Sequence, residues 1–355
     1  MIELSKNIKI GSNTICSSAP VYIIAEIGTN HCRGDMEIAK KMVLEAKRAG
    51  ANAVKFQTFK ADSLITRDAP QASRLDNILP SGKTWFDLLV SEELSYEKHK
   101  ELLGYCIEQE ITFLSTPYDN EGADFLCDEL DIPALKIASA DIVNHPLLEH
   151  CAKKMRPIIV STGMSNLDDV ENAIEVISGS GNKEIILLQC TAAYPTGLEN
   201  VNLKVISLYR EKFNCLVGYS DHSQSDLVPI SAVSLGAKVY EKHFTLSTFL
   251  PGADHETSYD PDEFKKMVDD IRQLEIVLGS KHKEVLSCEA ENQTKYRRSY
   301  VAVVDIEKDE TVSDDMLGIK RPGTGILPRK DSEIIGLRAK CRINKDTILD
   351  ISMLY

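Results

Sequence analysis

The sequence predicts a (β/α)8 barrel followed by a small, mostly β domain, and three observations lead to this prediction. Eight short apolar runs alternate with stretches of helical periodicity between residues 21 and 245. The composition changes after Gly279, and short alternating runs then lead to the C-terminus. With 355 residues, 43% of them hydrophobic, the chain can bury one large core and one modest core. The eight runs are 21–27, 53–59, 111–115, 134–138, 157–161, 184–190, 215–218 and 237–244.

Local signals define the elements around these runs. Residues 1–16 alternate around the turn signal Gly11-Ser12-Asn13, which predicts a hairpin that closes the floor of the barrel. Apolar residues at helical spacing predict helices over 35–49, 168–177 and 226–235. The last barrel helix is expected over 261–278, with Asp260 as its N-cap and Pro261 at its first position.

The connection over residues 60–95 is much longer than an ordinary barrel loop and contains Pro70, Pro80, Gly82 and Trp85. Loops of that length in compact domains are usually functional or mobile. We therefore predict a partly ordered lid over the site. A surface insertion with no role explains the length nearly as well.

The C-terminal part predicts a separate small domain. Residues 281–298 are charged and lack a convincing apolar face, which predicts a linker between domains at 1–280 and 299–355. Apolar runs occur at 300–304, 334–336, 339–343 and 348–349, and a glycine-rich loop at 320–325 presents two cations. A segment this short buries little core, so we expect it to lean on another surface.

Charge and cysteine usage restrict the class of protein. The formal net charge of -13 argues against a nucleic-acid groove or an anionic membrane surface, since both require clustered positive charge. The nine cysteines include no C-x-x-C pair, which is typical of reduced cytosolic thiols. No apolar run reaches membrane-spanning length, and residues 1–6 do not resemble a secretion signal. We expect a cytoplasmic protein.

Two histidines stand at the ends of neighbouring predicted strands. His222 follows Gly218-Tyr219-Ser220-Asp221, and His243 follows Glu241-Lys242. One histidine in such a place is more often a satisfied structural residue. A pair at consecutive strand ends favours a shared divalent metal, because neutral imidazole is a common ligand for such ions.

Further ionisable groups lie at other strand ends. Glu26 stands among apolar neighbours, and Lys55 and Lys136 end their runs. A lysine at a barrel strand end requires an anion, a carboxylate or a Schiff base as partner. Hydroxyls are individually weak signals, but as a set converging with two lysines they predict a phosphate nest. These hydroxyls belong to Thr116, Ser139, Ser161 and Ser220.

Together these segments resemble one enzyme family over essentially the whole chain. The motifs are IAEIGTNH (24–31), VKFQT (54–58), LSTP (114–117), LKIAS (135–139), VSTGM (160–164), QCT with YP (189–191, 194–195), GYSDH (218–222), EKHFT (241–245) and KRPG (320–323). They resemble those of the N-acetylneuraminate (sialic acid) synthases and the similar legionaminate and pseudaminate synthases. The resemblance implies a TIM barrel, a linker and an antifreeze-like (SAF) domain. It also implies condensation of phosphoenolpyruvate with an open-chain N-acetylated hexosamine.

The resemblance further implies roles for individual residues. His222 and His243 would bind Mn2+, or another divalent ion such as Mg2+ or Co2+. Glu26 and Asp141 would supply carboxylates near the reacting carbons, and Tyr194 and Asp254 would face the sugar. Arg321 would reach the N-acetyl group from a second subunit, which implies a domain-exchanged homodimer. The residues implied in phosphoenolpyruvate binding are Lys55, Gln57, Thr116, Lys136, Ser139, Ser161 and Ser220.

The acceptor and two rival functions remain open. Ala192 stands where sialic acid synthases often show Asn or Ser, whereas retention of 251–254 favours the sialic and legionaminic branch. The resemblance therefore implies N-acetylmannosamine or a 2,4-diacetamido-dideoxy analogue as acceptor. A Schiff-base aldolase using Lys55, Lys136 or Lys242 is one rival. A non-catalytic glycan-binding protein is the other.

Overall fold

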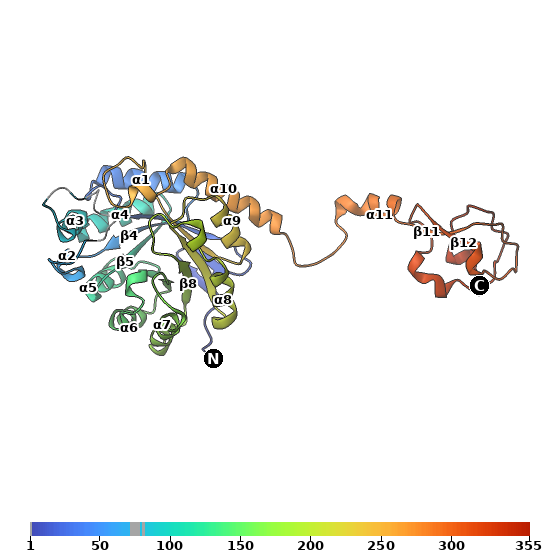
Figure 1. Ribbon diagram of the computed structural model, residues 1–355, viewed down its shortest axis with the longest axis horizontal. Helices are drawn as coiled ribbons and strands as arrows, with labels where there is room; N and C mark the ends of the chain where they lie inside the picture. The colour runs from blue at the N-terminus through green and yellow to red at the C-terminus, as the bar shows by residue number, and fades with distance from the viewer. Residues whose placement is uncertain (1, 72–78, 80–81) are drawn as a thin grey trace. The chain divides into compact units, whose positions relative to one another are not determined.

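The computed structural model describes residues 2–71, 79 and 82–355, and the chain divides into two compact units, Met1–Gly279 and Ser280–Tyr355. The first unit is a closed barrel of parallel strands, with β10 pairing back to β3 (Figure 1). Each predicted run overlaps one strand, so the barrel prediction is confirmed. The strands are β3 (Tyr22–Gly28), β4 (Ala53–Thr58), β5 (Thr112–Pro117), β6 (Leu135–Ile137), β7 (Ile158–Ser161), β8 (Ile185–Cys190), β9 (Leu216–Asp221) and β10 (Val239–His243).

Helices surround the strands and pack their apolar faces on the outside of the barrel (Figure 1). In the last of them, the Asp260 side chain accepts hydrogen bonds from the backbone of Asp262 and Glu263, with Pro261 at the first position. The predicted cap is confirmed. The longer helices are α1 (Met36–Arg48), α4 (Tyr96–Glu108), α6 (His145–Lys153), α7 (Leu167–Gly179), α8 (Lys204–Phe213), α9 (Leu227–Ser234) and α10 (Pro261–Leu278), and the short α5 (Asn120–Asp124) continues into a π-helical turn (Phe125–Glu129).

An apolar plug fills the N-terminal end of the barrel. The predicted hairpin forms from β1 (Asn7–Ile10) and β2 (Asn13–Cys16). Its side chains Ile8, Ile10 and Ile15 join one buried cluster with inward-facing strand residues, among them Ile24 and Leu114. The interior at the N-terminal end of the barrel is therefore mostly hydrocarbon, and the charged inward groups lie at the C-terminal ends of the strands.

The described parts of the long connection after β4 contain the helices α2 (Ala61–Leu64) and α3 (Trp85–Glu92). Thr84 caps α3 through a reciprocal pair of hydrogen bonds with Asp87. Residues 72–78 and 80–81, which include Pro80 of the predicted lid, lie outside the described residues. The role of this connection as a lid over the site stays a prediction.

The second unit has its own small core, which includes Tyr300, Ile306 and Leu349. Strands β11 (Ser299–Ala302) and β12 (Leu317–Lys320) pair antiparallel, and isolated bridges link the other short runs. The apolar run at 334–336 differs from the expected extended form. It makes a turn in which Ile334 is buried while Gly336 takes a φ of +90°, a conformation that ends extended pairing.

The segment predicted as a linker contains a helix that the sequence did not indicate, α11 (Ala290–Tyr296). The backbone N–H of Gly323 donates to the carbonyl oxygen of Thr294 at 2.9 Å, so α11 contacts the loop that carries Arg321.

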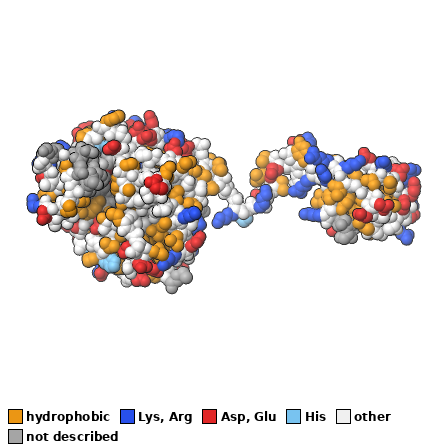
Figure 2. All heavy atoms as spheres, in the orientation of Figure 1, with side chains coloured by type: hydrophobic (Ala, Val, Ile, Leu, Met, Phe, Trp, Pro, Cys, Tyr) orange, Lys and Arg blue, Asp and Glu red, His pale blue; other side chains and the backbone are white. Residues whose placement is uncertain are grey.

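The surface carries mixed charge. On the face of the barrel unit in Figure 2, basic and acidic side chains are interspersed among apolar ones. Among the described residues, the helices are each too short or too polar to cross a bilayer.

Gly218 on β9 offers a direct stability test. A Cβ atom there would lie 2.3 Å from the carbonyl oxygen of Val239 and 2.5 Å from Leu188 Cδ2, so the barrel interior has no room for it. We expect Gly218→Ala to lower the free energy of unfolding by about 1–3 kcal/mol, as overpacking does. Gly179→Ala is the control, because nothing lies within 4 Å of its Cβ position. Urea denaturation measures both, and equal midpoints for the two variants would contradict this account.

Candidate active site

The C-terminal strand ends surround a cavity of about 780 Å3, and each of the eight strands contributes at least one lining side chain. Alternation along the strands produces this arrangement, because every second side chain faces inward. On β3, Ile24 belongs to the apolar plug and Glu26 lines the cavity. On β10, Val239 belongs to the plug, and Glu241 and His243 line the cavity. Polar groups thus lie directly above hydrocarbon.

Four buried charges form the base of the cavity. Lys55 Nζ lies 2.6 Å from Glu26 Oε2 and 3.7 Å from Glu241 Oε1. Lys136 Nζ lies 3.6 Å from the same Glu241 oxygen. Their side chains are at most 5% exposed. Two ammonium groups and two carboxylates therefore neutralise one another when no other ion is present, which limits the cost of burying them.

The two carboxyl groups differ in their proton affinity. Burial raises the pKa of Glu26 above its ordinary value, although the Lys55 ammonium opposes the shift. Burial acts in the same direction on Glu241, but Lys136 and Lys55 outweigh it and hold the pKa of Glu241 well below its usual range. Neighbouring acids with pKa values pushed apart are typical of sites that move protons.

Sequence reasoning assigned no role to Glu241, although the structure places it between both lysines. The signal was available: in a strand, residues two apart face the same side, so Glu241 must share the orientation of His243. Tyr118 was also missed. Its hydroxyl donates to Gln57 Oε1 at 3.2 Å, and Gln57 Nε2 donates to Glu26 Oε1 at 3.2 Å, which orients the Glu26 carboxyl.

The four predicted hydroxyls all line the cavity. Lys55 Nζ donates to Thr116 Oγ1 at 3.2 Å, and Ser220 Oγ donates to Glu241 Oε1 at 3.1 Å. Ser139 Oγ accepts from the backbone N–H of Gly163 at 3.0 Å. Ser161 Oγ is buried and has no hydrogen-bond partner among the described residues. These groups stand beside the two ammonium groups, where an anion would find its donors.

The two histidines come together at the cavity wall, with ring centroids 5.3 Å apart. His222 Nδ1 lies 2.9 Å from the carbonyl oxygen of Thr191. Since a carbonyl only accepts, Nδ1 carries the proton and Nε2 keeps its lone pair. His243 Nδ1 is buried without a hydrogen-bond partner in the described part of the chain, and burial lowers the pKa of His243. Both rings are therefore suited to hold a cation.

This donor set fits a metal with few protein ligands. Asp254 Oδ2 lies 4.0 Å from His243 Nδ1. Within residues 2–71, 79 and 82–355, no group of three or more His, Cys, Asp or Glu side chains has metal-binding geometry. A cation held by the imidazole pair would keep positions open for substrate and water.

The residues implied for the sugar, and the second carboxylate implied near the reacting carbons, are placed differently from one another. Tyr194 and Asp254 line the cavity, and the Tyr194 ring centroid lies 4.1 Å from that of His222. Asp141 is half-buried, accepts a hydrogen bond from Asn144 at 3.1 Å, and is not among the described lining residues. Arg321 lies in the second unit, where its guanidinium is 5.1 Å from the ring centroid of Tyr296. Its approach to a sugar stays a prediction.

Lys242, one of the lysines considered for a Schiff base, faces the outside of the barrel. Its Nζ lies 3.1 Å from Asp221 Oδ2 and 4.1 Å from the centroid of the Tyr259 ring, and the residue is fully buried there. The reason is alternation again, because Lys242 is one residue from the inward-facing His243. Among the three lysines of that hypothesis, Lys242 is therefore wrong as a candidate, and Lys55 and Lys136 remain.

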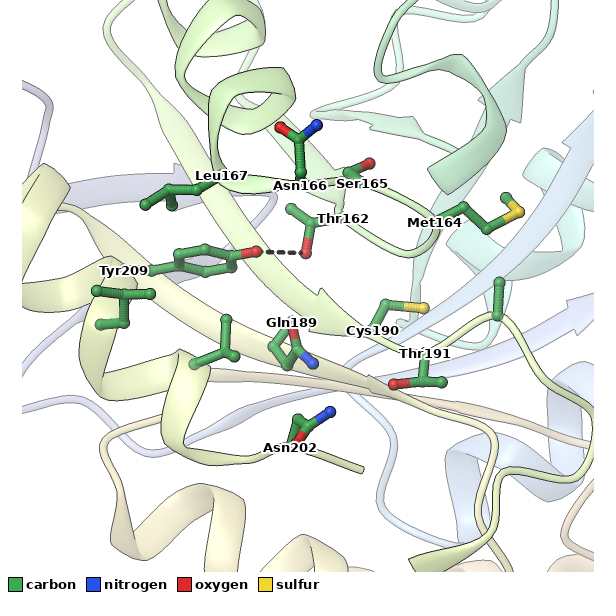
Figure 3. Close-up of a pocket in the computed structure, with 13 residues that line it drawn as sticks. Thr162, Met164, Ser165, Asn166, Leu167, Gln189, Cys190, Thr191, Asn202 and Tyr209 are labelled. Atoms are coloured by element: carbon green, nitrogen blue, oxygen red, sulfur yellow. Dashed lines mark hydrogen bonds between the residues drawn. The ribbon is translucent and has the colours of Figure 1, made fainter. Parts of the chain in front are cut away.

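A second cavity of about 560 Å3 lies beside the first and shares Met164, Cys190 and Ala192 with it. Figure 3 shows the Tyr209 hydroxyl pointing at Thr162, to whose Oγ1 it donates at 3.0 Å. The described side chains that line this second cavity are uncharged. Of these two cavities, the first is the one whose described lining holds the buried lysines, the carboxylates and the imidazole pair, and we take it as the candidate active site.

Comparison with known proteins agrees with this architecture. The chain is 42% identical over 337 residues to N,N'-diacetyllegionaminic acid synthase of Legionella pneumophila, covering 94% of each protein. It is 36% identical over 340 residues to N-acetylneuraminate-9-phosphate synthase of Mus musculus, covering 94% of this chain and 93% of that one. A solved N-acetylneuraminic acid synthetase from Leptospira borgpetersenii, in complex with citrate, aligns with a TM-score of 0.72 and 32% identity. The alignment covers 82% of this chain and 96% of that one.

The family matches account for both units. The SAF domain matches residues 297–354, and the NeuB family matches residues 42–283, which cover β4 to β10 and the helices between them. With a closed barrel, charged and imidazole groups gathered at its strand ends, and relatives similar over nearly their whole length, this chain belongs to the NeuB family.

Proposed function

We propose that this protein is a nonulosonate synthase, which condenses phosphoenolpyruvate with an open-chain N-acetylated hexosamine and releases phosphate. One observation carries the proposal: the Lys55 and Lys136 ammonium groups share a cavity with the paired imidazoles of His222 and His243. The two ammonium groups suit an anionic substrate, and the imidazole pair, through a bound cation, suits an electrophilic one. The names of the relatives from Legionella pneumophila and Mus musculus support the same reaction class.

Phosphoenolpyruvate brings a phosphate and a carboxylate into a chain whose net charge is -13. Two lysines and converging hydroxyl donors compensate that charge locally. The Ser161 hydroxyl, buried and unpartnered within the described residues, gains a hydrogen bond when the anion binds. The other groups proposed to hold phosphoenolpyruvate are Gln57, Thr116, Ser139 and Ser220, which line the same cavity.

In the first chemical step, C3 of phosphoenolpyruvate attacks the aldehyde carbon of the sugar and a C–C bond forms. The aldehyde oxygen gains negative charge and then takes up a proton. A divalent ion such as Mn2+, Mg2+ or Co2+, held by His222 and His243, would supply the polarisation of that oxygen. Tyr194 and Asp254, which stand beside the imidazoles, orient the sugar chain.

In the second step, water adds to the former enol carbon C2, which has become cationic. Glu26 takes the proton from this water, and its negative charge also stabilises the cationic centre. The C2–O bond to phosphate then breaks while the C2 hydroxyl gives up its proton to the departing phosphate, and a 2-keto acid remains. The raised pKa of Glu26 suits a base, whereas Asp141 stands outside the described lining of the cavity.

Arg321 remains the residue that we propose to reach the N-acetyl group from a second subunit of a domain-exchanged homodimer. The small core of the second unit supports this arrangement, since so short a segment gains stability from a further surface.

A Schiff-base aldolase is the second candidate, and one observation favours it: burial lowers the pKa of Lys136, which increases the fraction of its amine that is uncharged and able to attack a carbonyl. Borohydride reduction in the presence of pyruvate and the sugar tests it by mass spectrometry. We expect no covalent adduct on Lys55 or Lys136, because each ammonium lies within 4.0 Å of a carboxylate, which favours the charged form of the amine. An adduct on either lysine would favour the aldolase.

The metal prediction concerns both binding and turnover. Incubation with phosphoenolpyruvate, Mn2+ and a panel of N-acetylated hexosamines should release phosphate. His243→Ala should weaken Mn2+ binding by at least about 100-fold, measured by calorimetry without substrate, because an imidazole ligand is lost. His150→Gln is the control, since His150 pairs with Asp124 on the surface at 2.6 Å.

The outcomes separate enzyme from binding protein. An unchanged Mn2+ affinity in His243→Ala would contradict the proposal that His243 binds a metal. A parent protein that releases no phosphate, together with a His243→Ala variant that still binds sugar, would favour the glycan-binding protein.

The pH dependence of the reaction rate follows from the protonation state of Glu26. A base works only when ionised, and the pKa of Glu26 is raised, so kcat/KM should fall on acidification at a pH above the ordinary carboxyl range. Glu26→Gln should lower kcat by about 100-fold or more. Asp141→Asn, outside the described cavity lining, should lower it far less. Steady-state kinetics of both variants and the parent measure these losses and the acidic fall of kcat/KM. A range of about pH 5 to 9 spans the pKa values of histidine and of a raised carboxyl group. Equal losses in the two variants would contradict the assignment.

A further inference from the structure

A fully buried ion pair on the outside of the barrel takes no part in the proposed chemistry. Lys242 Nζ lies 3.1 Å from Asp221 Oδ2, and both side chains are 0% exposed. Neither residue belongs to the described lining of the cavity. Burying two charges is costly, and hydrocarbon of similar volume often stabilises such a place equally well. The pair therefore needs an explanation other than stability.

The two residues lie opposite each other on neighbouring strands. In the parallel pairing of β9 with β10, Lys242 is the partner of Asp221. Side chains alternate along a strand, so the residues that follow an outward pair point inward. Those following residues are His222 and His243, which both line the cavity. The ion pair is thus one step along the strands from the two imidazoles, on the opposite side of the same backbone.

Further contacts connect the ion pair to the backbone around His222. The Tyr240 hydroxyl donates to Asp221 Oδ2 at 2.7 Å, and the backbone N–H of Ser223 donates to Asp221 Oδ1 at 2.8 Å. The Lys242 ammonium donates to the carbonyl oxygen of Ser223. The residues before and after His222 are therefore both bonded to the ion pair.

Tyr259 extends these contacts to the other histidine. Its ring centroid lies 4.1 Å from Lys242 Nζ. Its backbone N–H donates to the carbonyl oxygen of His243 at 2.9 Å. The backbone at each imidazole is thus connected to the same buried ammonium group.

We infer that the ion pair of Asp221 with Lys242 fixes the register of β9 against β10 and so holds both imidazoles within reach of one cation. Asp221 and Lys242 are positioning residues, because they act on the cation through the histidines beside them. The inference rests on the proposed function, in which His222 and His243 hold a divalent ion.

The pair is selective where the neighbouring contacts are not. Val217, Tyr219 and Tyr240, on the same outer side of the strands, belong to the apolar core, and apolar contacts are non-directional. A shift of two residues would keep every side chain on its own side and move one imidazole roughly 7 Å past the other. The same shift would separate Lys242 from Asp221 and leave two buried charges unpaired, which is strongly unfavourable.

The experiment measures cation binding by the full-length protein without substrate. The double variant Asp221→Asn with Lys242→Met removes both charges together, so neither is left buried alone. We expect its Mn2+ affinity, measured by calorimetry, to be about tenfold to a hundredfold lower than that of the parent, as for other groups that orient metal ligands. The visible absorption of the Co2+-loaded variant should also change, because it reports the geometry of the ligands.

A matched control separates positioning from a general loss of stability. Thr58 lies on β4, which pairs with neither β9 nor β10. Its buried hydroxyl lies 2.8 Å from His99 Nε2 and 2.7 Å from Ser115 Oγ. Thr58→Val should lower the midpoint of urea denaturation and leave the Mn2+ affinity unchanged.

A milder variant decides the question if the double variant fails to fold. Tyr240→Phe removes one hydrogen bond to Asp221 and no charge. We expect it to weaken Mn2+ binding by about threefold, in proportion to the loss of one hydrogen bond. Unchanged binding in Tyr240→Phe would then overturn the inference.

The outcomes distinguish this inference from the proposed function. A loss of Mn2+ affinity in the double variant, with the affinity of the parent in Thr58→Val, supports the inference. The affinity and Co2+ absorption of the parent in the double variant, or an equal loss in Thr58→Val, overturns it and leaves the proposed metal site standing. A parent protein that binds no Mn2+ overturns both.

Discussion

The buried charge layer of Glu26, Lys55, Lys136 and Glu241 is the interaction on which the candidate site depends. Each of these groups is costly to bury alone, and each has an opposite charge within 4.0 Å. In the protein alone, the carboxyl groups balance the lysines. An arriving anion can replace that balance, which leaves Glu26 available for proton transfer. The same four residues thus make the barrel end stable when empty and attractive to an anion.

The charge layer in turn depends on the apolar plug beneath it. Ile8, Ile10 and Ile15 of the N-terminal hairpin fill the barrel with inward strand residues and leave the charged side chains exposed only towards the cavity. Gly218 shows how tight the fit is, because neighbouring strands approach to distances that no Cβ could tolerate. The close packing in the apolar plug and the ionic contacts at the strand ends have one cause. Side chains alternate between inward and outward positions along each strand of a closed barrel.

The cavity joins this polar base to a wall of different origin. Strand ends supply the groups that the reaction class needs, whereas the β4–β5 connection supplies the hydrocarbon of Ile65 and Leu89. Barrel enzymes commonly vary their loops while they keep the strand-end chemistry. Relatives of this chain are named for different sugar acids.

The sequence by itself determined the barrel, the hairpin, the cap of α10 and the pairing of His222 with His243, because strand periodicity and capping are local and parallel strand ends meet at one edge. Only the tertiary structure decided which side chains at the strand ends become ionic partners. Closure of the barrel turns Glu241 towards Lys55 and Lys136 and turns Lys242 outwards. Packing between segments distant in the chain leaves Asp141 outside the described lining and brings Leu89 to the cavity. No local sequence pattern encodes such packing.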